Sequence, residues 1–134
     1  MGRMAFPFLL LAVTACQTAG PGDPLKLDVN KPPRDAVVAV GIQAQKCWFK
    51  SGDPVFQRYR LANEVNSFSG RPRVLLVPRA RPGDLPSLVV EARAGSAAGS
   101  SVIQAFGPLV GSKDGARIIA DVKRWALGSK SCKA

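Results

Sequence analysis

The sequence predicts a two-layer α+β sandwich, in which an antiparallel meander of three or four strands is flanked by an N-terminal and a C-terminal helix. The expected order is α-β-β-β(-β)-α. Apolar residues recur at steps of three and four near both ends of the expected domain. Between residues 55 and 109 they alternate with polar residues or form short runs separated by turns that contain Gly and Pro. The 46% hydrophobic and 21% charged residues are typical of a globular protein.

The first helix is expected over residues 35–50. Asp35 follows two prolines and is a suitable N-cap. After it, apolar residues repeat on one helical face, and these are Val37, Val40, Gly41, Ala44, Cys47 and Trp48. The β-branched residues of this stretch would also suit a strand, so that alternative stays open.

The strands of the meander are expected in the middle of the chain. Tyr59, Leu61 and Val65 alternate with charged residues, which indicates a half-buried strand. Three further apolar runs cover residues 73–77, 88–93 and 102–106, with turn signals at 69–72 and 81–84. The Gly- and Ser-rich stretch 95–101 lacks the Lys-Ser/Thr ending of a phosphate-binding loop, and we interpret it as a hairpin loop.

The last helix opens at Asp114, the candidate N-cap, and stops at Gly128. Its apolar residues fall on one face, and these are Ile118, Ile119, Val122, Trp125 and Ala126. Cys132 follows this helix by four residues, so a bridge to Cys47 would tie the end of the first helix to the end of the last. We therefore expect both helices on the same face of the meander.

The chain begins with one basic residue, Arg3, and an apolar run too short to span a bilayer, as in a signal peptide. The next four residues, Val13-Thr14-Ala15-Cys16, resemble a bacterial lipobox. This resemblance to bacterial lipoproteins implies that residues 1–15 are a signal peptide and that Cys16 carries the lipid, with two or three acyl chains for stable anchoring. Gln17 in the next position implies delivery to the outer membrane, on the periplasmic side.

The domain organisation follows from this resemblance. Residues 16–34 would be the lipidated cysteine and a flexible tether rich in Pro and Gly, and residues 35–134 a single α+β domain. Leu25, Leu27 and Val29 alternate with polar residues, so this stretch could add a short edge strand.

The same resemblance gives the three cysteines different roles. Cys16 takes the lipid, which leaves Cys47 and Cys132 as a disulfide pair in an oxidising compartment. The alternatives are two unrelated thiols, or an intermolecular bridge to a partner or to a second copy in a homo-oligomer.

The charge balance bears on partners rather than on fold. The net charge is +10, and removal of Arg3 with the leader leaves +9. A periplasmic location argues against nucleic acid as a partner. The anionic partners that remain are lipid phosphates, anionic glycans, peptidoglycan carboxylates or an acidic protein. A solvated basic surface without a partner is the plain alternative.

Arginines are the candidate binding residues, because a guanidinium pairs bidentately with phosphate or carboxylate. Seven arginines and no lysine occur in the sheet region: Arg58, Arg60, Arg71, Arg73, Arg79, Arg81 and Arg93. Six of them form three pairs two residues apart, so the members of each pair would point to one side of an extended chain, whereas Arg93 stands alone. They would form an anion- or partner-binding face, or they would guard strand edges against aggregation.

Catalytic motifs are not found in the sequence. It contains no histidine, so His-based triads and the usual zinc sites are not expected. Glu64 and Glu91 are its only glutamates, and their spacing does not pair them. We therefore expect no enzyme, no cofactor and no metal, but a lipid-anchored binding or scaffolding module that faces the periplasm. The alternatives are a small component of a secretion or envelope-assembly machine, or an inhibitor of a cell-wall hydrolase.

Overall fold

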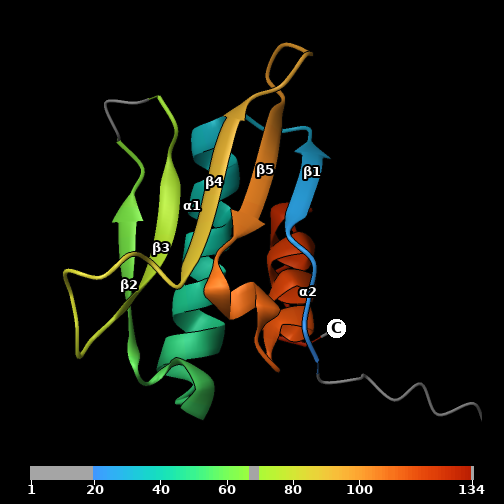
Figure 1. Cartoon of the computed structure of the whole chain (residues 1–134). Coiled ribbons are helices and arrows are strands. Elements are labelled where there is room, and N and C mark those ends of the chain that lie inside the picture. The colour runs from blue at the N-terminus through green and yellow to red at the C-terminus, as the bar shows by residue number, and fades with distance from the viewer. Residues whose placement is uncertain (1–19, 67–69, 134) are drawn as a thin grey trace, which may run out of the picture.

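A computed structural model describes residues 20–66 and 70–133. Figure 1 shows one sheet with two helices behind it, a two-layer α+β arrangement. This confirms the predicted fold class. The lipobox and Cys16 lie outside the described residues. Within those residues, no helix is long and apolar enough to cross a membrane.

The sheet has five strands in the order β1-β5-β4-β3-β2, and every neighbouring pair is antiparallel. The strands are β1 (Leu25–Val29), β2 (Tyr59–Glu64), β3 (Arg73–Pro78), β4 (Leu88–Ala94) and β5 (Ser101–Phe106). Strands β2 to β5 are the expected meander. The fifth strand is β1, which pairs with β5 at the edge, as the alternation of Leu25, Leu27 and Val29 allowed.

The first helix, α1, spans Pro33–Ala44 and continues without a break into η1, a π-helix over Gln45–Lys50. The sequence predicted Asp35 as its N-cap, and that was wrong: the cap is Pro32, and Asp35 lies in the first turn. The helix starts earlier because Pro33 suits a first helical position, where no N–H is needed. The last helix, α2, spans Gly115–Ala126 with Asp114 at the N-cap position, as expected.

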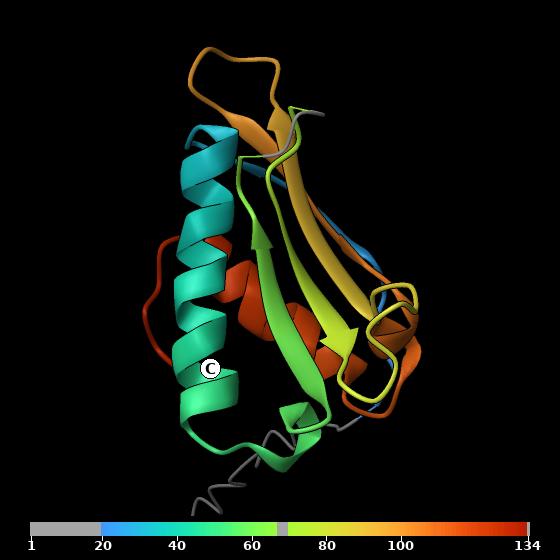
Figure 2. The same ribbon diagram turned by 90° about the vertical axis from the view of Figure 1, so that its left-hand side faces the viewer.

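Both helices cover the same face of the sheet, as Figure 2 shows. Helix α1 packs on β3, β4 and β5, whereas α2 packs on β1 and β5. The core between the layers contains two tryptophans, Trp48 from η1 and Trp125 from α2, which are 2% and 0% exposed. The Trp48 ring stacks on Phe56 of the 3-10 turn η2 (Pro54–Phe56), with ring centroids 4.5 Å apart.

Part of the predicted tether belongs to the folded domain. The amide of Ala116 donates to the carbonyl of Gly20, and the amide of Gly22 donates to the carbonyl of Val110 in η3 (Pro108–Gly111), both at 2.9 Å. Together with β1, these contacts hold the chain against the domain from residue 20 onward. The prediction of flexibility up to residue 34 was wrong for this part because the alternating residues find a strand partner in β5.

Candidate functional site

The face of the sheet opposite the helices is not uniformly basic. Leu75, Val77 and Val102 are 6%, 6% and 7% exposed there, although they lie outside the main core cluster. Phe106 at the end of β5 is 40% exposed. The predicted guanidinium field is therefore interrupted by an apolar strip across the middle strands.

Two of the seven arginines are neutralised by the two glutamates. Arg73 lies directly opposite Glu64 on β2 and forms an ion pair with it. Arg71 pairs with Glu91 of β4 at 3.6 Å. These pairs could not be read from the sequence, because their members are distant in the chain and meet only through the strand register. Arg73–Glu64 is a cross-strand pair, whereas Arg71 lies just before β3. We interpret both as surface ion pairs that contribute at most about 1 kcal/mol each to stability.

Two further arginines do not join a common site. Arg81 pairs with Asp84 within the loop between β3 and β4, at 3.6 Å, and its side chain is 80% exposed. Arg93 lies in β4 opposite Val102, beyond the ion pair of Arg71 and Glu91. Among the described residues, no carboxylate lies within ion-pair distance of Arg93.

The remaining three, Arg58, Arg60 and Arg79, gather at one end of β2 and β3. The amide of Arg79 donates to the carbonyl of Arg58 at 2.9 Å, so these two residues are cross-strand neighbours. Arg60 and Arg79 line a hollow of about 350 Å³ together with Lys50 of η1, and its other lining residues are Gln45, Phe49, Gln57 and Leu61. We call this hollow the basic pocket.

The basic pocket concentrates positive charge. Its lining includes three cations and no carboxylate. In the described part of the chain, no carboxylate pairs with Arg58, Arg60 or Arg79. Guanidinium and ammonium groups held close together without counter-ions make a positive potential that attracts anions. Lysine at position 50 was not among the sequence-predicted site residues, because only the tertiary structure brings η1 beside β2.

A larger groove adjoins the basic pocket. It has a volume of about 640 Å³ and is lined mainly by α1, η1 and β2, through Val38, Gly41, Ile42, Gln45, Lys46, Lys50, Asn63 and Val65. We call it the edge groove. It shares Gln45 and Lys50 with the basic pocket, so the two hollows are adjacent along β2. In sequence, the only sign of this groove is the position of Ile42 off the apolar face of the helix.

The edge groove exists because α1 lies over the middle of the sheet. A Cβ on Gly41 would lie 3.0 Å from Asn63 Oδ1 of β2 and 3.2 Å from Val74 Cγ2 of β3, so glycine lets the helix come close to the side chains of both strands. Strand β2 extends past the helix and leaves an apolar recess, in which Ile42 is 59% exposed. The recess is bounded on one side by helix and on the other by the edge strand.

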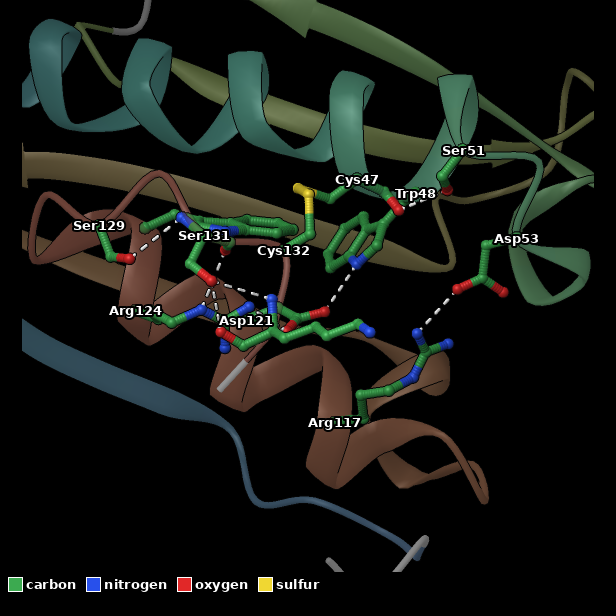
Figure 3. The surroundings of a disulfide bond; sticks show 12 residues. Cys47, Trp48, Ser51, Asp53, Arg117, Asp121, Arg124, Ser129, Ser131 and Cys132 are labelled. Atoms are coloured by element: carbon green, nitrogen blue, oxygen red, sulfur yellow. Dashed lines mark hydrogen bonds and ion pairs between the residues drawn. A yellow bond between two sulfur atoms is a disulfide. The ribbon is translucent and has the colours of Figure 1, made fainter.

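The disulfide predicted from the cysteine count is present. Cys47 of η1 and Cys132 of the C-terminal tail are joined within one chain, as Figure 3 shows. Nearby, Trp48 Nε1 donates to Asp121 of α2 at 2.8 Å, and Arg124 donates to the same carboxylate at 2.6 Å. This cluster ties η1, α2 and the tail together, so we assign it a structural role.

Residues 20–66 and 70–133 hold no group of three or more His, Cys, Asp or Glu residues that could bind a metal ion. Comparison with models of known protein families, with curated proteins and with solved structures finds no match for this chain. The basic pocket and the edge groove are the features of the described residues that bear on function.

Proposed function

We propose that this chain is a bacterial lipoprotein anchored through Cys16 to the periplasmic side of the outer membrane, and that its domain is a non-catalytic module that binds an anionic or protein partner. The lipobox-like residues 13–16 support the anchor. The disulfide between Cys47 and Cys132 is consistent with an oxidising compartment.

One observation carries the binding part of this proposal. Arg58, Arg60 and Arg79 gather with Lys50 at one end of the sheet, without a carboxylate partner in the described residues. Uncompensated like charges repel one another, so the arrangement lowers stability unless an anion binds there. The sequence predicted a contact surface of seven arginines, but Arg71, Arg73 and Arg81 already have acidic partners. The proposed contact surface therefore contains fewer arginines.

The anchor is tested by changing its cysteine. In the variant Cys16→Ser, the lipid attachment site is lost, and we expect the protein to move from the membrane to the soluble periplasmic fraction. Fractionation of cells that express the full chain, with intact-mass measurement of the acyl chains, provides the readout. If the variant still sediments with membranes, the lipoprotein assignment is wrong.

The binding surface is tested with two charge-matched triple variants of the full chain. The first variant changes Arg58, Arg60 and Arg79 together to Ser. We expect in-cell crosslinking to capture the partner at least about tenfold less efficiently, a loss of about 1.4 kcal/mol. The control changes Arg34, Arg81 and Arg93 to Ser, which removes the same charge elsewhere and should leave capture unchanged. Equal losses in both variants would show that net charge, and not this surface, governs binding.

A further inference from the structure

We propose that the outer edge of β2, together with the edge groove and the basic pocket, binds an extended acidic segment of a partner protein by strand addition. The segment would pair its backbone with β2 and place carboxylates in the basic pocket. This inference rests on the proposed function, because it specifies how the binding module recognises its partner.

The first support is the free edge of β2. Among the described strands, β2 pairs only with β3, so the backbone groups along its other side have no strand partner. Such a row of N–H and C=O groups is a template for another chain. The opposite edge of the sheet, β1, differs because α2 packs against this strand.

The second support is the shape beside that edge. Side chains of an added strand point alternately to the two faces of the sheet, so one set would enter the edge groove between α1 and β2. A volume of about 640 Å³ lies within the range of pockets that enclose ligands, about 300–1,000 Å³. Ile42 and Val65 offer apolar contacts there, while Asn63 offers an amide.

The third support is the charge at the end of the groove. Lys46 and Lys50 stand along its rim, and Arg60 and Arg79 line the adjoining basic pocket. A peptide that lies along β2 therefore meets apolar side chains first and cations afterwards. Carboxylates complement this end, and guanidinium groups can bind them bidentately. The π-helix at 45–50, a rare element often found at functional sites, shapes the wall that the two hollows share.

An anionic membrane surface is the alternative ligand for these cations. A bilayer surface is flat on the scale of the domain and cannot enter a recess between a helix and an edge strand. A single extended chain fits such a recess. For this reason the geometry favours a peptide, and anionic lipid becomes an outcome of the test.

The experiment uses the lipidated full chain in nanodiscs of zwitterionic lipid as bait for a phage library of random dodecapeptides. We expect the enriched sequences to combine β-forming residues with Asp or Glu. The strongest peptide is then synthesised with a fluorophore, and its affinity is measured by fluorescence anisotropy. A second version carries N-methyl groups on alternate backbone amides, which removes strand pairing and keeps the side chains; we expect its affinity to fall at least about tenfold.

Single variants localise the site. Ile42→Asp in the edge groove and Arg60→Glu in the basic pocket should each lower the affinity for the peptide by at least about tenfold. The matched controls are Leu85→Asp, at a residue 88% exposed in the loop between β3 and β4, and Arg93→Glu, at the far end of β4. Both controls should bind as the unaltered protein does. Circular dichroism confirms that each variant is folded.

Three results would overturn strand addition: no enrichment from the library, equal affinity of the N-methylated peptide, or equal losses in groove and control variants. Binding to phosphatidylglycerol vesicles that depends on Arg60 and Arg79, without peptide enrichment, would assign the site to lipid instead. The proposed function is tested independently of strand addition. If the partner captured in cells depends on Arg58, Arg60 and Arg79 but not on Ile42, the binding module stands and strand addition is wrong.

Discussion

At the scale of single residues, Asp121 links the two helices of the core. Its side chain is 8% exposed and accepts hydrogen bonds from Trp48 Nε1 and from the guanidinium of Arg124. A buried carboxylate is tolerated only when such partners replace its water. Because Trp48 is itself 2% exposed, its N–H has no access to solvent if this acceptor is removed.

We therefore expect Asp121→Ala to lower the free energy of unfolding by about 2–3 kcal/mol, since it leaves the buried N–H of Trp48 without an acceptor. It also removes the ion pair of Arg124, whose Nε then keeps only the carbonyl of Ser131 as acceptor. Asp121→Asn keeps an acceptor for Trp48 and should cost less. Urea unfolding followed by tryptophan fluorescence measures both values. Equal losses in the two variants would contradict the role given to the hydrogen bond from Trp48.

Close backbone contacts also require glycine at positions 22 and 115. A Cβ on Gly22 would lie 2.7 Å from the backbone of Gly115, and a Cβ on Gly115 would collide with the carbonyl of Val110. No side chain fits between these segments, so glycine at both positions allows the chain to lie against the start of α2.

We expect Gly115→Ala to lower the free energy of unfolding by about 1–3 kcal/mol, because the backbone of η3 or of residues 20–22 must shift. The matched control is Gly111→Ala in the same region, where a Cβ would meet nothing within 4 Å. Thermal unfolding of the two variants provides the comparison. A Gly115→Ala protein as stable as the control would contradict the close packing described here.

At the scale of elements, the disulfide joins the end of the first helical segment to the tail that follows α2. Cys47 and Cys132 are separated by 85 residues in sequence, so the bridge closes most of the domain into one loop. The tail has further contacts of its own, since Trp125 Nε1 donates to the carbonyl of Ser131 at 2.8 Å. The bridge therefore acts chiefly on the unfolded chain, by limiting its freedom.

We expect the double variant Cys47→Ser, Cys132→Ser to keep the fold and to lose about 2–4 kcal/mol of stability, from the larger chain entropy of the unfolded state. Urea unfolding of the oxidised protein, the reduced protein and the variant measures this loss. The reduced protein should resemble the variant. Mass spectrometry of the oxidised protein should show a monomer with two fewer hydrogens, and a dimer that is lost on reduction would contradict the intramolecular bridge.

Periodicity predicted the type of each element more accurately than its ends. The apolar face of α2, with Ile118 and Val122, matches the pattern in sequence because one side of that helix meets the core. The start of α1 was misplaced because a capping carboxylate and a first-turn carboxylate look alike in sequence. Asp35 occupies the first turn, and Pro33 begins the helix instead.

At the scale of the whole molecule, the early docking of the chain would limit the distance between the domain and a membrane if the proposed anchor is present. Gly20 is hydrogen-bonded to α2. If Cys16 is lipidated, four residue steps separate the anchor from the domain, which span about 14 Å when fully extended. In Figure 1 the described chain begins at the end of the molecule that carries η3, opposite the loop between β4 and β5.

We accordingly expect the lipidated protein in nanodiscs with gadolinium-labelled lipid to show the strongest paramagnetic broadening for amides of η3 and the start of α2. Amides 95–100 in the loop between β4 and β5 should be least affected. Nuclear magnetic resonance spectra with and without the labelled lipid measure the effect. Insertion of twelve Gly and Ser residues after Ala19 should remove the gradient, and a gradient that persists would contradict an orientation imposed by the short connection.

The sequence by itself determined the two-layer α+β class, the meander and the apolar helix faces that carry the two tryptophans, because each of these follows from local periodicity. The pairing of Cys47 with Cys132 was one of several alternatives in the sequence, and the structure shows it within one chain. Only the tertiary structure decided which arginines pair with glutamates and which lie beside other cations. Strand register places Glu64 beside Arg73 and brings Glu91 to Arg71, while the position of η1 brings Lys50 to Arg60 and Arg79. These contacts join residues distant in sequence, and register and helix placement depend on packing of the whole core.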